Sequence, residues 1–273
     1  MTAHDLRTAG PAPDALRIRP TLGQALGQCL TLAWRGVVKI PSNPLGLGDV
    51  VIGPAIFLLL FGYVFGGAIA GDTDAYLQYV FPGIVAMMTL FATMGVAVAL
   101  STDLSTGVFD RLRSLPIVRC APLVGAIGTD VVRQIVSLVA LLGFGLLLGV
   151  RLEAGALSVL AAGALALAFA LALSWVWVLL ALVVAETQAV QGLAAVLILP
   201  LTFASNVFVP VDTMPGWLQG VARANPVSHL VDALRGLLMG GPVAEPVLTT
   251  LLWMAGFVIL FAPLSLLAYS RRA

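Results

Sequence analysis

Long apolar stretches separated by short polar segments run through most of the chain. Six of them approach the roughly 20 residues that a helix needs to cross the hydrocarbon core of a bilayer. Only helices and closed barrels pair every backbone amide in lipid, and the alternation typical of barrel strands is absent from this sequence. The pattern predicts an all-α polytopic membrane protein with six transmembrane helices, over residues 50–70, 76–102, 134–150, 156–185, 187–211 and 246–270.

The third of these spans is the shortest, with 17 residues in 134–150. It reaches a full crossing only if the helix begins near Ala121, and it then includes Asp130 and Arg133. Apart from these two residues, the six spans contain no charged residue, and Glu186 alone separates spans four and five, so the chain of buried carboxylates that a proton relay needs is missing. We therefore expect no coupling to an ion gradient.

The residues before the first span divide into two parts. Residues 1–20 are polar, contain Pro11 and Pro13, and have no apolar core of the length that a secretory signal needs, so they predict a disordered cytoplasmic tail. Within 21–48, apolar residues recur at helical spacing before a proline-rich turn, which predicts an amphipathic helix on the membrane surface. An ordinary soluble helix packed on another element is the alternative. The apolar positions include Leu22, Leu26, Leu30, Trp34 and Val37.

Composition and charge support a membrane protein and predict its orientation. Charged residues make up 10% of the chain, against roughly 25% in soluble domains. Arginine and lysine concentrate before the first span, between the second and third spans, and at the C-terminus, leaving only Arg151, Arg223 and Arg235 elsewhere. By the positive-inside rule, both termini and the segment between spans two and three face the cytoplasm.

Motifs for chemistry within the chain are missing from the sequence. The only lysine, Lys39, follows Val38 instead of the glycine of a phosphate-binding loop. No serine has a glycine two residues before it, and no H-E-x-x-H pattern occurs. Cys29 and Cys120 lack the spacing of a metal site or a redox pair. We therefore expect no enzyme active site, no metal site and no nucleic-acid partner.

Residues 103–120 form the most polar segment between two spans. They combine mixed charges with an apolar ridge of Val108, Leu112 and Leu115 and a proline stop. Such a segment can dock a short helix in a groove of a soluble partner. A solvated loop, held on the cytoplasmic side by its arginines, fits the residues alone equally well.

Three segments resemble a known family. They are "TDAYLQYVFPGI" at 73–84, "FDRLRSLPIVRCAPLVGAI" at 109–127 and "PLTFASNVFVPVDTMPGWLQGVARANPVSHLVDALRGLLMGG" at 200–241. The chain is similar, along nearly its whole length, to the membrane subunits of ABC-2 type exporters, in particular the daunorubicin/doxorubicin resistance permease group. The resemblance implies a six-helix domain over 49–273 that forms a homodimer and pairs with two copies of a separate ATPase subunit.

The resemblance also implies the function. The chain would be the permease of a bacterial plasma-membrane exporter for a bulky amphipathic compound, such as an anthracycline-like drug, while the partner ATPase binds ATP and Mg. Lipid or glycolipid export is the close alternative, and a non-transporting membrane scaffold for a soluble partner is the other. Carried over residue by residue, the contact with the ATPase would be made by Asp103, Gly107, Asp110, Arg111, Leu112 and Pro116.

Two further sets of residues are candidates for the transport path. Within 212–241, two short amphipathic helices separated by the Asn225–Pro226 break are expected on the outer side, where Asp212 or Thr213 could cap the first. They could cover an exit path or simply anchor the protein at the interface. Soft apolar side chains in the second span and polar ones at the end of the fifth could contact the substrate. These are Met87, Met88, Phe91, Met94, Ser205, Asn206 and Phe208. Asn206 is expected to point inward, because an amide facing lipid would be costly.

Overall fold

The structure, a computed structural model, describes residues 27, 31, 44–66, 71–106, 121–184 and 186–272. Throughout these residues the regular structure is helical, as the sequence predicts. The N-terminal tail, most of the expected surface helix and the expected ATPase contact from Gly107 onward lie outside the described residues. The helices are α2 (Pro44–Leu59), the π-helix η2 (Leu60–Phe65), α4 (Thr73–Ser105), α6 (Ala121–Leu147), α7 (Ala156–Val184), α8 (Thr187–Phe203), the short 3₁₀ helix η3 (Val211–Thr213), α9 (Gly216–Ala224), α10 (Pro226–Met239) and α11 (Ala244–Arg272).

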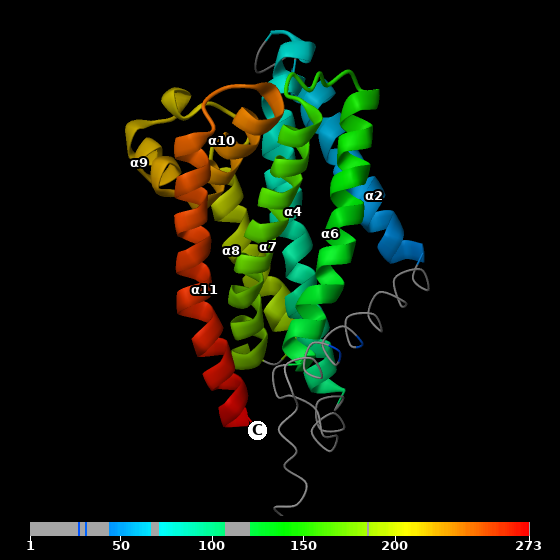
Figure 1. Cartoon of the computed structure of the whole chain (residues 1–273), viewed down its shortest axis with the longest axis vertical. Helices are drawn as coiled ribbons and strands as arrows, with labels where there is room; N and C mark the ends of the chain where they lie inside the picture. The colour runs from blue at the N-terminus through cyan, green and yellow to red at the C-terminus, as the bar shows by residue number, and fades with distance from the viewer. Residues whose placement is uncertain are drawn as a thin grey trace, which may run out of the picture.

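Helix α4 lies at the centre of the bundle and packs against α6, α7, α8 and α10 (Figure 1). Helix α11 packs on α7 and α10, and α2 packs on α6. The short helices α9 and α10 lie together at one end of the bundle, called here the α10 end. The C-terminus lies at the opposite end, and the chain leaves α4 and enters α6 there.

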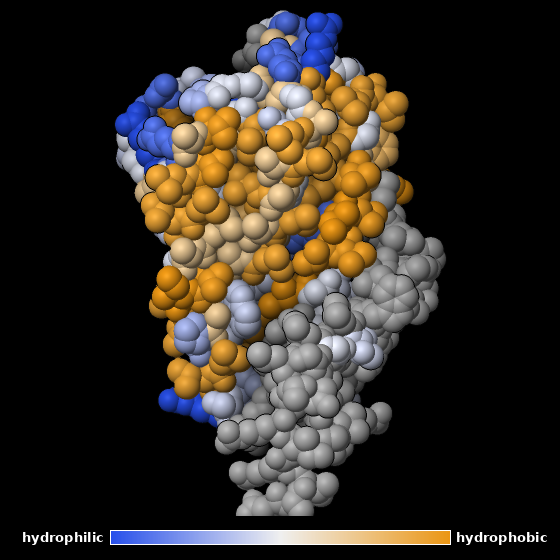
Figure 2. Space-filling model, viewed as in Figure 1, coloured by the Kyte–Doolittle hydropathy of each residue, from blue (hydrophilic) through white to orange (hydrophobic). Residues whose placement is uncertain are grey.

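Four helices are long and apolar enough to cross a membrane by length and composition: α4, most of α6, α7 and α11. The first and fifth expected spans correspond to shorter apolar helices, Ile52–Phe65 and Thr187–Phe203. Figure 2 shows hydrophobic residues over most of the visible helical surface, with hydrophilic residues gathered at the two ends. An exposed apolar surface of this extent belongs in lipid, so the chain is a membrane protein.

Helix α6 begins at Ala121, so the third span does extend back far enough to include Asp130 and Arg133. Their charges face each other at 2.5 Å, and Arg133 also donates to the carbonyl oxygen of Ala92 in α4. Gln134 donates to the second carboxylate oxygen of Asp130 at 3.0 Å. Pairing within one helix face lowers the cost of charges in a membrane helix, which is why these two residues do not end it.

The bundle core contains polar groups that are paired across helices. Trp177 of α7 is fully buried, and its indole nitrogen donates to the hydroxyl of Thr93 in α4 at 2.7 Å. The same hydroxyl donates to the carbonyl oxygen of Leu90. A buried indole needs such a partner, and this bond fixes the register between two extensively packed helices.

Two boundaries differ from those expected. Helix α2 begins at Pro44, inside the segment expected to be a turn, because proline at a first helical position costs no backbone bond. Helix α8 ends at Phe203 and not near Val211, and the chain then runs without a helix through residues 204–210, called here the 204–210 loop. The last carbonyl groups of α8 find partners outside the helix.

Candidate functional site

Asn225 connects the end of α8 to the start of α10. Its side-chain nitrogen donates to the carbonyl oxygens of Leu201 and Ala204, at 2.7 and 2.9 Å, which satisfies two acceptors that the end of α8 leaves open. Its side-chain oxygen accepts from the backbone nitrogen of Val227 at 2.9 Å and so caps α10. One buried amide therefore fixes the angle between the two helices.

Replacing Asn225 with alanine is expected to lower the free energy of unfolding by about 2–3 kcal/mol, because a helix cap is lost and two buried carbonyls lose their donor. Thermal unfolding of the purified protein in detergent measures this loss. Asn225→Ser keeps a good capping group but supplies no amide donor to α8. It should recover only the part due to the cap, and full recovery would contradict the role of the two carbonyl contacts.

A polar cluster formed by Tyr79, Asn206, Asp232 and Arg235 lies between α4, the 204–210 loop and α10. One oxygen of Asp232 accepts from the side-chain nitrogen of Asn206 at 2.6 Å and from Arg235 at 3.0 Å. Arg235 also donates to the backbone oxygens of Asn206 and Tyr79, at 3.3 and 3.5 Å. The guanidinium lies 4.2 Å from the centre of the Tyr79 ring, within the range of a cation–π contact.

The electrostatics of this cluster are those of a partly buried ion pair. Burial raises the pKa of the Asp232 carboxyl above its usual value, while Arg235 and the hydrogen bond from Asn206 act in the opposite direction. Tyr79 adds a hydroxyl bond to the carbonyl oxygen of Asn206 at 3.3 Å. Together these contacts hold the 204–210 loop against both α4 and α10.

Two more contacts attach the same loop. Tyr76 of α4 donates to the carbonyl oxygen of Phe208 at 3.2 Å, and the backbone nitrogen of Asn206 donates to the hydroxyl of Ser228 at 3.3 Å. Gly83 allows the loop to approach α4 closely, because a Cβ at this position would lie within 2.9 Å of the Cα of Val207. The loop is therefore a packed element of the bundle and not a surface connection.

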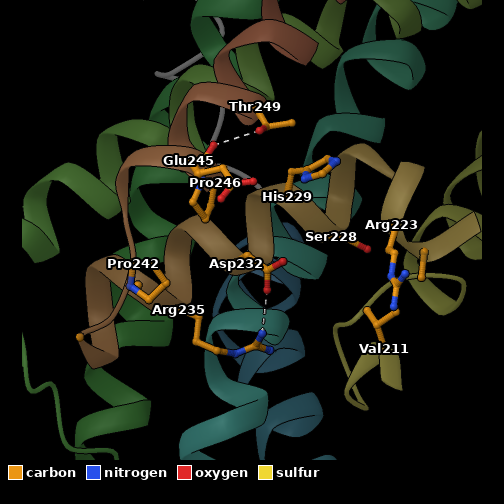
Figure 3. A pocket seen from close by; sticks show the side chains of 13 residues that line it. Val211, Arg223, Ser228, His229, Asp232, Arg235, Pro242, Glu245, Pro246 and Thr249 are labelled. Atoms are coloured by element: carbon orange, nitrogen blue, oxygen red, sulfur yellow. Dashed lines mark hydrogen bonds and ion pairs between the residues drawn. The ribbon is translucent and has the colours of Figure 1, made fainter. Parts of the chain in front are cut away.

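A cavity of about 450 Å³ opens next to the polar cluster, between α9, α10 and the first turns of α11 (Figure 3). Its walls carry charges of both signs together with proline, glycine and alanine. Its charged and titratable lining residues are Arg223, His229, Asp232, Arg235 and Glu245. A cavity of this volume, with apolar walls and a few converging polar groups, is typical of sites for small organic ligands.

The structure brings together only some of the expected path residues. Ser205, Asn206 and Phe208 are buried in one loop, and Asn206 points inward as expected, but its amide nitrogen is occupied by Asp232. The four apolar candidates lie in α4 instead: Met87 is fully buried, and Met88, Phe91 and Met94 pack partly buried against the same core. None of the seven lines the cavity. Their role as substrate contacts remains a prediction.

The remaining expectations have mixed outcomes. The chain breaks at Asn225–Pro226 as predicted, with a helix on each side. The expected cap at Asp212 or Thr213 is wrong, because these residues form the separate turn η3 and α9 begins after Pro215. Asp103 lies in the last turns of α4, at the end opposite α10. The other five expected ATPase contacts lie outside the described residues.

Sequence reasoning missed Asp232, Arg235 and Tyr79 as a cluster. The sequence did contain a weak signal. Asp232 and Arg235 are three residues apart in a helix whose other face is apolar, and charges at this spacing can pair on one helix face. Nothing in the sequence pointed to Tyr79 as their partner. Within the described residues, no group of three His, Cys, Asp or Glu side chains is arranged to hold a metal ion.

Comparison with known proteins places these features in a family. Residues 27–239 match the family model described as ABC-2 type transporter. The chain is 39% identical over 254 residues to the daunorubicin resistance ABC transporter permease protein DrrB1 of Streptomyces coeruleorubidus, covering 93% of this chain and 90% of that protein. It is 30% identical over 226 residues to the probable doxorubicin resistance ABC transporter permease protein DrrC of Mycobacterium tuberculosis, covering 82% and 81%.

A more distant relative is the putative transport permease ycf38 of Cyanophora paradoxa, 26% identical over 214 residues, with 77% of this chain and 73% of that protein covered. The family model extends across the polar cluster and most of the helical bundle. The chain therefore belongs to the ABC-2 type transporter family.

Proposed function

We propose that the chain is the permease subunit of an ATP-binding cassette exporter that moves a bulky amphipathic compound, such as an anthracycline-like drug, out of the cell. The observation that carries the proposal is the 39% identity to a daunorubicin resistance permease over 93% of this chain. Energy would come from ATP hydrolysed by a separate ATPase subunit, two copies of which would pair with two copies of this chain in a bacterial plasma membrane.

The distribution of charges supports an orientation with the α10 end outside the cell. Arg271 is at the opposite end of the bundle, together with the C-terminus, whereas the acidic residues Asp72 and Asp74 lie at the start of α4, at the α10 end. The positive-inside rule then assigns the C-terminal end to the cytoplasm. The ends of α4 and α6 that flank residues 107–120 lie on this cytoplasmic side, where a soluble ATPase would be reached.

In this proposal, export is a population shift. ATP-driven closure of the two ATPase subunits moves the segment around Asp110, and the membrane halves change the side to which their shared path opens. The packed contacts among α4, the 204–210 loop and α10 support transmission along α4, since a rigid helix carries a displacement from one end of the bundle to the other.

The proposal is tested by drug accumulation in a sensitive bacterial host that carries this chain and its ATPase partner. Asp110→Ala should lower the rate of doxorubicin efflux about tenfold, because a lost charge-assisted contact of this kind corresponds to about 1.4 kcal/mol or more. Glu186→Gln, an exposed charge between α7 and α8 at the same end, is the matched control and should leave efflux unchanged.

Two outcomes would contradict this function. Efflux that is unchanged by Asp110→Ala at equal membrane levels of the protein would argue against the coupling role of this segment. Drug accumulation equal to that of cells without the chain would argue for a scaffold, because a membrane anchor for a soluble partner moves no compound. Export of labelled lipid instead of drug in the same cells would favour the lipid-exporting alternative.

A further inference from the structure

The charged residues that line the cavity at the α10 end are two arginines and two carboxylates, and of these four Glu245 alone has no ion pair among the described residues. The guanidinium of Arg235 is directed to Asp232, Asn206 and Tyr79 in the polar cluster. Arg223, on α9, contacts Asp212 and Gln219 at 3.5 and 3.3 Å. Both arginines that line the cavity therefore already have acceptors.

The carboxylate oxygens that line the cavity have fewer hydrogen-bond and ion-pair partners than the arginines. Glu245, in the first turn of α11, forms no ion pair among the residues that the structure describes. The hydrogen bonds that Asp232 accepts from Asn206 and Arg235 both go to the same carboxylate oxygen. Figure 3 shows Glu245 on α11 at the cavity that His229 and Asp232 line from α10, with the carboxylate of Asp232 directed to Arg235. The two carboxylates offer acceptors only, which favours a cation over an anion beside them.

The arrangement fits an organic cation better than a metal ion. In the described part of the chain, no three acidic, cysteine or histidine side chains lie close enough to coordinate a metal. Instead, Asp232 and Glu245 line a volume of about 450 Å³ whose walls also contain Pro242, Pro246 and Ala222. An ammonium group can share two carboxylates at longer distances while apolar walls contact the carbon atoms next to it.

An apolar surface continues from the cavity along α11. Residues 245, 249 and 252 follow one another at helical spacing, so Leu252 lies below Glu245 and Thr249 on the same face. Leu252 is 65% exposed, and the neighbouring Leu248 is 60% exposed. A molecule with its cationic group in the cavity would therefore meet an open hydrophobic helix surface in the direction of the membrane core.

The turn between α10 and α11 builds this wall of the cavity. Gly240 and Gly241 adopt φ values of +80° and +142°, which favour glycine, and they reverse the chain within a few residues. After the turn, the backbone at Pro242 packs on Gly236, where a Cβ would lie 2.6 Å from the carbonyl oxygen of Pro242. This turn brings the first residues of α11, including Glu245, to the wall of the cavity.

We propose that this cavity binds the ammonium group of an amphiphile that carries a protonated amine, with Glu245 and Asp232 as its anionic partners and the exposed face of α11 as the surface for its apolar part. The amine can come from an exported compound or from the headgroup of an aminophospholipid. A role for the site in releasing exported compounds rests on the proposed function, whereas the binding itself does not.

Binding can be measured with the full-length protein in nanodiscs of phosphatidylcholine, without nucleotide or ATPase. Two probes differ only in charge: doxorubicin, whose amino sugar is protonated at neutral pH, and its N-acetyl derivative, which is uncharged there. Quenching of tryptophan fluorescence is a suitable readout, because Trp217 of α9 and Trp253 of α11 belong to helices that line the cavity. The variants are Glu245→Gln and, as the matched control, Glu153→Gln, an exposed residue at the same end outside the cavity.

We expect the wild-type protein and the Glu153→Gln control to bind doxorubicin about tenfold more tightly than the N-acetyl derivative, as expected for one charge-assisted contact. Glu245→Gln should bind both probes with similar, weak affinity while its melting temperature stays close to that of the wild type. Equal affinity of the wild-type protein for the two probes would overturn the proposal. So would a preference for the charged probe that persists in Glu245→Gln.

A second set of nanodiscs, containing phosphatidylethanolamine, distinguishes the two sources of the amine. Weaker doxorubicin binding in these discs, lost in Glu245→Gln, identifies the lipid amine as a competing occupant of the same site. Unchanged binding identifies the exported compound as the occupant. Because no ATPase is present, the binding measurement is independent of the efflux test. A failure of the efflux test would leave the binding result valid, and a failure of the binding test would leave the coupling role of Asp110 untouched.

Discussion

Gly83→Ala should lower the free energy of unfolding by about 1–3 kcal/mol, the range for overpacking in a filled core. In most helix interiors the same exchange is favourable by about 1 kcal/mol, because alanine is the better helix former. Here the new methyl group would meet the backbone of Val207, with its Cα at 2.9 Å and its carbonyl carbon at 3.0 Å. Backbone atoms cannot rotate away as a flexible side chain can, so the 204–210 loop must shift as a whole.

The expected loss has a defined structural origin. Moving the loop away from α4 lengthens the bonds from Tyr76 to Phe208 and from Tyr79 to Asn206, which now measure 3.2 and 3.3 Å. We therefore expect lower export activity as well as a lower melting temperature in detergent. Gly163→Ala in α7 is the matched control, because no atom lies within 4 Å of the added Cβ. A Gly83→Ala protein as stable as Gly163→Ala would show that the loop does not pack on α4 as described.

The helical character of the chain could be predicted from hydropathy because lipid leaves few alternatives to a helix. The charged pair in α6 shows why boundaries are less certain: a hydropathy window penalises Asp130 and Arg133 separately, whereas in the fold each neutralises the other at 2.5 Å. The end of α8 was predicted too late for a related reason. The helix can stop at Phe203 because the side chain of Asn225, from another segment, donates hydrogen bonds to the carbonyl groups at its end.

The polar cluster could not be predicted from periodicity, because its members come from distant parts of the chain. Arg235 contacts the carbonyl oxygen of Tyr79 across 156 positions of sequence, and no local pattern specifies which helices become neighbours. Asn206 was expected to be buried, and it is, because an unpaired amide facing lipid is costly. Its partner Asp232 follows only from the packing of α10 on α4.

Arg235→Ala should be among the most damaging single changes at the α10 end. It removes the partner of Asp232, the cation–π contact with Tyr79 and the bond to the carbonyl of Asn206. Breaking a fully buried ion pair costs 3–5 kcal/mol, and exposed pairs contribute about 0–1 kcal/mol. The side chains of Arg235 and Asp232 are 23% and 44% exposed, so we expect a loss of about 2–3 kcal/mol in the free energy of unfolding, between these two limits.

The matched control is Arg223→Ala, an arginine on the neighbouring helix whose side chain is 66% exposed and whose contacts measure 3.3 Å and longer. It should change stability by no more than about 0.5 kcal/mol, as is usual for a surface substitution. Arg235→Lys separates charge from shape, because an ammonium group can pair with Asp232 but cannot also lie flat on Tyr79 and reach both carbonyls. If Arg235→Lys is as stable as the wild type, the charge alone holds α10 to α4 and the planar contacts contribute little. If Arg235→Ala is no less stable than Arg223→Ala, the polar cluster does not hold the α10 end together.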